Sequence, residues 1–173
     1  MARDPYLAMA LNNAWANATL YGALAGLAPG AFAAPAPGFF PSLAATLNHI
    51  HEVDLYYIDA LEGGGAGRSV YEREMEADPV ALGRAQAEAD RRLAAFCGGL
   101  GPAALSARRA TERPGGRVLE ERVDALLLHL FQHQIHHRGQ AHVQLQAAGL
   151  APPQLDAFHL DFERAPSAAA YHP

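Results

Sequence analysis

Five of the nine histidines in the sequence fall within fourteen consecutive residues, and their types and spacing point first to metal chemistry. They are His129, His133, His136, His137 and His142. Two more, His49 and His51, stand close together earlier in the chain. A neutral imidazole nitrogen is a good ligand for zinc, nickel, copper or iron. The arrangement of the imidazoles on helices therefore decides whether they could share an ion.

Helical projection at ~100° per residue sorts the later histidines by face. His133 and His137 are four residues apart, so they lie ~40° from each other on one face, which also carries leucine and alanine side chains. His129 and His136 lie roughly 60–80° to one side, nearer the boundary with solvent. We therefore expect His133 and His137 to point into the protein.

The earlier pair divides in the same way. His49 shares a sector with apolar side chains, whereas His51 lies ~160° from that sector and is expected to be exposed. Three imidazoles can thus converge from two helices, and three imidazoles plus water make an open metal site of the catalytic type. The alternative interpretation is that these residues are core histidines that bind no metal.

The string His133-Gln134-Ile135-His136-His137 invites comparison with the His-Glu-x-x-His motif of zinc peptidases. Here Gln134 occupies the position of the glutamate general base, and an amide cannot accept and pass on a proton. The sequence therefore argues against peptidase activity by that mechanism.

Four long helical patterns carry these residues. Asp4 and Asp78 each precede a proline at a first helical position, another helix is expected to open near Ser42, and Gly63 and Gly149 can end two of the helices. We predict helices from Pro5 to about Leu27, from about Ser42 to Gly63, from Pro79 to Gly98 and from about Glu120 to Ala148.

This pattern predicts an all-α fold, a four-helix bundle with long crossover connections, in a single domain over residues 1–173. A short hairpin between Ala104 and Val118 is an additional reading. The tail from Ser167 to Pro173 is expected to be frayed.

Composition excludes several classes of function. The 173 residues carry a net charge of −5, which gives no footprint for nucleic acid. All 13 positive charges are arginines, so Schiff-base and P-loop chemistry, which need a lysine, are excluded. Cys97 is the single cysteine, which excludes a disulfide framework. With no export or membrane segment recognised, a cytoplasmic protein is expected.

Three segments together resemble the DinB-like family of bacterial proteins. The run from His129 to His142 (HLFQHQIHHRGQAH) resembles the family signature, Thr46–Ile50 (TLNHI) followed by Asp54 resembles its second-helix motif, and Asn13–Asn17 (NAWAN) matches its first-helix pattern. The resemblance covers most of the chain. It implies a four-helix bundle with crossover connections and a divalent metal held by three histidines, which fall on His49, His133 and His137.

The resemblance implies a class of activity but does not identify a single reaction. Some relatives are enzymes that use low-molecular-weight thiols, so we expect a metal-dependent transferase or hydrolase with zinc or nickel, a small-molecule substrate and a thiol as co-substrate. A metal-binding or stress-response protein without turnover is the alternative. No catalytic residue is assigned, and we expect a homodimer without a nucleic-acid or membrane partner.

The sequence also suggests roles for four residues on the same two helices as the histidines. Arg138 is expected in a surface or helix-crossing ion pair, or at the mouth of a substrate pocket, and Gln140 next to an imidazole N–H. Asp54 suits a structural hydrogen bond, and Tyr56 packs the core or lines the pocket. Because ligation needs neutral imidazoles, with an ordinary pKa of about 6.5, metal-dependent stability is expected above about pH 6.5.

Overall fold

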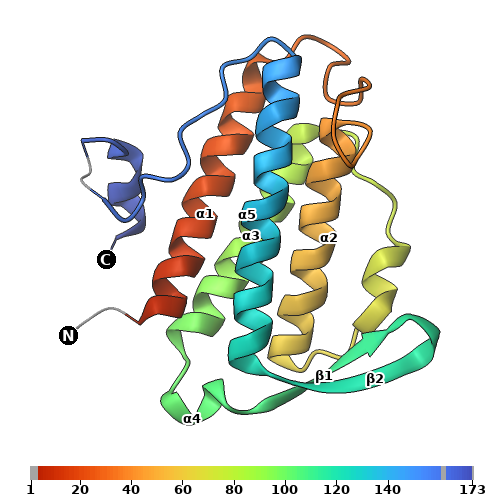
Figure 1. The fold of residues 1–173 in the computed structure, drawn as a ribbon, viewed down its shortest axis with the longest axis vertical. Coiled ribbons are helices and arrows are strands. Elements are labelled where there is room, and N and C mark those ends of the chain that lie inside the picture. The colour runs from red at the N-terminus through yellow and green to blue at the C-terminus, as the bar shows by residue number, and fades with distance from the viewer. Residues whose placement is uncertain (1–3, 161–162, 173) are drawn as a thin grey trace.

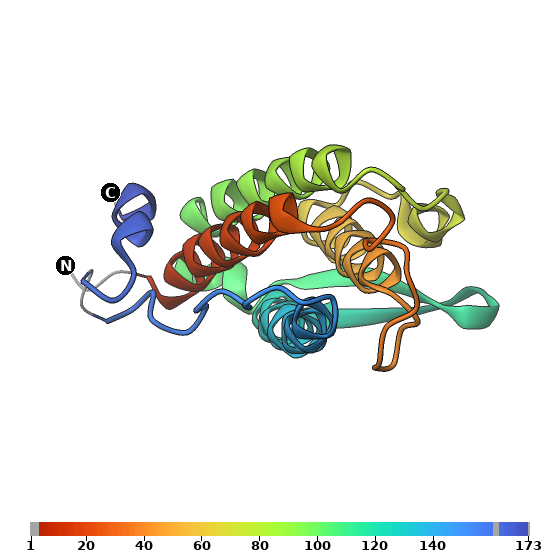
Figure 2. The ribbon, with the colours of Figure 1, turned by 90° about the horizontal axis from the view of Figure 1, so that it is seen from above.

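Four long helices lie side by side in the computed structural model, which describes residues 4–160 and 163–172 (Figure 1). They are α1 (Pro5–Ala23), α2 (Leu43–Glu62), α3 (Pro79–Gly98) and α5 (Val123–Ala147). Helix α1 packs mainly on α3, and α5 packs mainly on α2, which also contacts α3 (Figure 2). Over the described residues, no helix has the length and apolar character needed to cross a membrane.

A small antiparallel sheet amends the all-α expectation. Strands β1 (Arg108–Arg113) and β2 (Arg117–Arg122) pair from Arg108 with Arg122 to Arg113 with Arg117. The hairpin anticipated before the last long helix is thus present. It also includes residues 120–122, whose backbone groups pair across the sheet, so α5 begins at Val123 rather than at Glu120.

The remaining elements are short and lie in the connections. They are the 3₁₀ helices η1 (Leu24–Gly26), η2 (Gly67–Glu72), η3 (Pro114–Gly116) and η4 (Pro166–Tyr171), and the single turn α4 (Pro102–Leu105). The first long helix was predicted to reach Leu27, but residues 24–26 tighten into η1, so the α-helix ends at Ala23.

The N-terminal caps predicted at Asp4 and Asp78 are confirmed, and Ser42 caps α2. The carboxylates of Asp4 and Asp78 each accept a bond at 2.9 Å from the backbone N–H two residues on, and Ser42 Oγ accepts one at 3.1 Å. These bonds satisfy N–H groups that the first turn of a helix leaves without partners. Gly63 follows α2 with a φ of +74°, a conformation that glycine adopts without strain.

The C-terminal segment packs against α1, contrary to the expected frayed tail. Trp15 Nε1 donates a 2.9 Å hydrogen bond to Ser167 Oγ, and the Trp15 ring lies 5.7 Å from that of Phe158. Ala168 in η4 is fully buried. A buried indole has a large apolar surface and an N–H that needs an acceptor, and the tail supplies both an apolar contact and that acceptor. Pro173 lies outside the described residues.

A buried polar network occupies the space between the helices. Arg138 Nη1 on α5 donates to the amide oxygens of Asn13 and Asn17 on α1, at 3.0 Å for Asn17. The amide nitrogens of the two asparagines donate in turn to Asp90 Oδ1 on α3, at 2.9 and 3.0 Å. Arg138 is only 5% exposed, so the expected surface position is wrong, and its bonds go to neutral amides rather than to an ion-pair partner.

Gln86 extends the network to α2. Its Nε2 donates to Asp54 Oδ2 at 2.7 Å and to Asp90 Oδ1 at 3.2 Å, which gives Asp54 the structural hydrogen bond expected for it. Burial raises the pKa of Asp54 and of Asp90 to about 7 in each case, and burial lowers the pKa of Arg138 to about 10. The Arg138 charge opposes the rise at both carboxyls. The guanidinium thus reduces part of the cost of burying these two acids, together with the hydrogen bonds that they accept.

Replacing Arg138 by methionine is expected to lower the free energy of unfolding at pH 8 by ~3–5 kcal/mol, because ionised carboxylates stay buried without their cation. The folded pKa values of Asp54 and Asp90, about 7, lie above the unfolded value of about 4. Ionisation of these groups therefore removes stability as the pH rises from about 4 through 7. The cost of the substitution should be smaller at pH 5.

Urea unfolding at the two pH values measures this difference. Arg91→Met is the control, because Arg91 forms an exposed ion pair with Glu88 on α3 and should lose less than ~1 kcal/mol. Equal losses in the two variants at pH 8 would contradict the role given to Arg138.

Candidate metal centre

The packing of α2 on α5 brings the three predicted histidines together. His49 Nε2 on α2 lies 3.1 Å from His133 Nε2 on α5. The ring centroid of His137 lies 4.3 Å from that of His133 and 4.7 Å from that of His49. One ligand nitrogen from each residue falls within 4.8 Å of the other two. The three histidines are therefore positioned to bind a metal ion.

The nitrogen spacing fits a shared ion. Two imidazole nitrogens at ordinary zinc distances on a tetrahedral centre are about 3.3 Å apart. The separation of 3.1 Å between His49 Nε2 and His133 Nε2 is close to that value. Two neutral nitrogens can also form a hydrogen bond at this distance. Three converging imidazoles, however, fit one shared metal ion better than a hydrogen bond between two of them.

Gln140 orients one of the candidate ligands. Its Oε1 lies 2.9 Å from His137 Nδ1, and its Nε2 lies 3.1 Å from His136 Nε2. Because a carbonyl oxygen only accepts, His137 Nδ1 carries the hydrogen and its Nε2 keeps the lone pair for a metal. Gln140 thus serves an imidazole as predicted, although its partner is His137, not His133, towards which it projects along the helix.

Burial keeps the cluster neutral. Desolvation lowers the pKa of His49 to about 4 and that of His133 to about 3, and the neighbouring imidazoles lower both further. Burial also lowers the pKa of His137, whereas the hydrogen bond that His137 donates to Gln140 raises it. A metal ligand must have an unprotonated nitrogen, so the fold presents these imidazoles in the form that binds.

Phe40 covers one side of the cluster and was missed by the sequence analysis. Its ring lies 4.5 Å from the His49 ring and 5.5 Å from the His137 ring. Gln144 on α5 holds this loop in place, since its Nε2 donates to the Phe40 carbonyl at 2.9 Å while its Oε1 accepts from Thr46 at 2.7 Å. The loop between α1 and α2 has no period that predicts such a contact.

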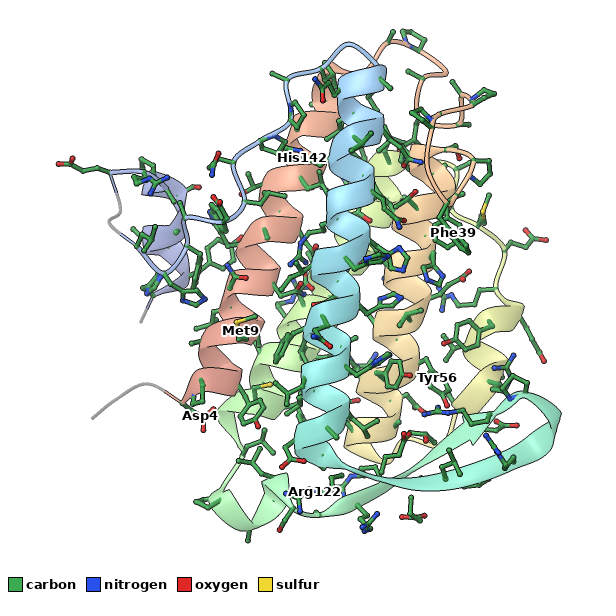
Figure 3. The ribbon with its side chains drawn as sticks, in the orientation of Figure 1. Asp4, Met9, Phe39, Tyr56, Arg122 and His142 are labelled. Carbon is green, nitrogen blue, oxygen red and sulfur yellow. The ribbon has the colours of Figure 1, made fainter. Side chains whose placement is uncertain are left out.

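Aromatic side chains continue from the cluster along α2. The Tyr57 ring lies 4.9 Å from that of His129, which lies 6.3 Å from that of His133. His129 and His136 are exposed, in agreement with their expected boundary positions. Tyr56 is buried, and its hydroxyl donates to the backbone carbonyl of Glu112, so it anchors the hairpin. Figure 3 shows Tyr56 and Phe39 on the α2 side of α5.

His51 is buried, contrary to the prediction that it is exposed. Helix α2 packs on α5 with one side and on α3 with another, so residues on opposite sides of it are both covered. Burial lowers the pKa of His51 to about 4. This histidine belongs to the α2–α3 interface and does not join the candidate site.

Cys97 is buried, and burial raises the pKa of its thiol to about 12. The thiol therefore stays protonated near neutral pH, as expected of a small core residue. Since Cys97 is the only cysteine in the sequence, a thiolate at the candidate site has to come from another molecule.

Comparison with known proteins agrees with the fold. The structure of a DinB-like protein, YjoA from Bacillus subtilis, superposes with a TM-score of 0.63 over 87% of this chain and 96% of that one, at 16% sequence identity. No curated protein matches the sequence. The sequence profile of the DinB family matches residues 1–166. The chain therefore belongs to the DinB family.

Proposed function

We propose that the protein is a metal-dependent enzyme in which His49, His133 and His137 hold one divalent ion, zinc or nickel. The observation that carries the proposal is the convergence of three neutral imidazoles, with two Nε2 atoms 3.1 Å apart, from two packed helices. The four long helices would then act as a bundle that holds the two ligand-bearing helices in register.

We further propose a thiol-linked transfer or a hydrolysis of a small-molecule substrate. A divalent ion held by three imidazoles acidifies a water or thiol bound at its open position. The buried Cys97 supports a low-molecular-weight thiol that enters as co-substrate, because the chain itself offers no accessible thiol.

The surrounding side chains have separate parts in this proposal. Gln140 keeps His137 in the tautomer that ligates, and Phe40 shields the His49 and His137 rings from water. His129 and His136 are exposed beside the candidate ligands, where their ring nitrogens can hydrogen-bond a bound substrate.

Cobalt loading tests the metal site and its open position together. Wild-type protein should bind about one cobalt ion per chain, because three imidazoles form one site. Adding cysteine should then produce a near-ultraviolet absorption band of a cobalt-bound thiolate. His133→Ala should lose most of the bound cobalt, whereas His142→Ala, on the same helix but outside the cluster, should retain it.

Two results would count against the proposal. Full cobalt content in His133→Ala would contradict the ligand assignment. One bound cobalt ion with no thiolate band, and no change on adding competing anions, would indicate a closed site and favour a metal-binding protein without turnover.

Metal retention should extend to more acidic pH than unperturbed histidines allow. The pKa values of His49 and His133, about 4 and about 3, lie below the unfolded value of about 6.5. Neutral histidines therefore contribute stability that is present above pH 6.5 and is lost as the pH falls towards 4. We expect zinc to stay bound at pH 5.5, measured as zinc content after gel filtration. Half-loss near pH 6.5 would contradict this.

A homodimer is a further proposal. Leu128 and Val143 are 57% and 53% exposed on α5, whose formal charges are limited to Asp124 and the buried Arg138. An uncharged apolar helix face favours self-association, because its burial desolvates no ions. Light scattering at micromolar concentration should show a mass above 18.4 kDa, and Leu128→Gln with Val143→Gln should return it to that value. A wild-type mass of 18.4 kDa would end the proposal.

A further inference from the structure

A cavity of about 500 Å³ lies on the other side of α5 from the three histidines. Its walls come from α1, α5 and the segment 153–159. Figure 3 shows two of its lining residues, Met9 and His142, on the α1 side of α5, whereas Phe39 and Tyr56 lie on the α2 side. The volume is in the range of small-molecule sites, about 300–1,000 Å³.

The packing of the helices explains why space remains here. Helix α1 packs mainly on α3, and α5 mainly on α2, so the seam between α1 and α5 is less tightly joined than either of these interfaces. Gly139 faces this seam, and a Cβ at that position would meet no atom within 4 Å. The chain after α5 forms the third wall, which His142 Nε2 secures by donating to the Pro153 carbonyl at 2.9 Å.

Arg138 brings a buried positive charge to this cavity. The residue is 5% exposed and lines the cavity, while its Nη1 donates to Asn13 and Asn17. Those two bonds use both Nη1 hydrogens, and Nε and Nη2 carry three more. An arginine edge is well suited to bind a carboxylate through two parallel hydrogen bonds.

The rest of the lining combines apolar walls with few charges, which favours a ligand with an apolar body. Met9, Ile135, Pro153 and Leu155 supply apolar walls, and Ile135 is 52% exposed despite its apolar side chain. Asp156 is the acidic residue of the lining, and it is exposed, with its carboxylate accepting from Gln154. The cation is therefore deep in the cavity and the acid lies towards solvent.

We propose that this cavity binds a small amphipathic carboxylate, with its acid group on Arg138 and its apolar body against Met9, Ile135 and Leu155. The site is separate from the three-histidine cluster. It needs no metal, and it stands whether or not the protein is a metal-dependent enzyme.

Calorimetry with three eight-carbon probes tests the proposal on the metal-free protein. Octanoate should bind, whereas octylamine and octanol should bind at least about tenfold more weakly, because they lack the anionic group. Gly139→Leu fills the cavity from α5 and should weaken octanoate binding at least about tenfold. Gly22→Leu is the matched control on α1, since a Cβ there also meets nothing within 4 Å.

His133→Ala separates this site from the metal centre, because carboxylates also bind to metal ions. Octanoate affinity should be unchanged in His133→Ala, and Gly139→Leu should still bind about one cobalt ion per chain with the wild-type scattering mass. The proposal is wrong if octanoate does not bind, if octanol or octylamine binds as well, or if Gly139→Leu leaves octanoate affinity intact. It is equally wrong if His133→Ala abolishes binding.

Discussion

The buried guanidinium of Arg138 is the constraint on which the arrangement of the long helices depends. A charge that is 5% exposed requires polar partners, and two asparagines of α1 supply them. The same asparagines donate to Asp90 and so extend the network to α3. Meeting this requirement sets the rotation of α5 about its axis. His137 is the preceding residue, ~100° around the helix, so turning Arg138 towards α1 turns His137 towards α2. The same logic applies to α2, where Asp54 faces Gln86 on α3 and His49, ~140° away, faces α5. The polar network therefore aims the candidate ligands without contacting them.

Burial acts on the two polar clusters with opposite signs. It raises the pKa of the acids Asp54 and Asp90 to about 7, and it lowers the pKa of the bases His49 and His133 to about 4 and about 3. In both clusters the uncharged form is the one that desolvation favours. For the acids, the nearby guanidinium moderates this effect. For the imidazoles, a neutral ring is the ligating form, so the cost of burial and the requirement for metal binding point in the same direction.

Helical periodicity was enough to find the three converging histidines, because two of them lie four residues apart on α5 and the third lies on the apolar face of α2. The caps at Asp4 and Asp78 were equally readable from local chemistry. Projection failed for His51, since one inward direction was assumed for a helix that has neighbours on two sides. It had no means of predicting Phe40, which reaches the cluster from a loop held by Gln144. The docking of the tail on Trp15 depends on a contact between residues 152 positions apart, which no local pattern encodes.

Helix α5 has different neighbours on its two sides, and the charge of Arg138 acts on both the cavity that it lines and the buried carboxyls of Asp54 and Asp90. On the α2 side it carries His133 and His137, while on the α1 side it borders the cavity that Gly139 leaves open. An anion in that cavity and the buried carboxylates of Asp54 and Asp90 draw on the same positive charge. An anion bound to Arg138 would therefore weaken the stabilisation that this guanidinium gives to ionised Asp54 and Asp90. Occupancy of the cavity would in this way raise the free-energy cost of ionising the two buried carboxyls. Because that network also sets the rotation of α5, the direction of the histidines and the charge state of the core rest on one side chain.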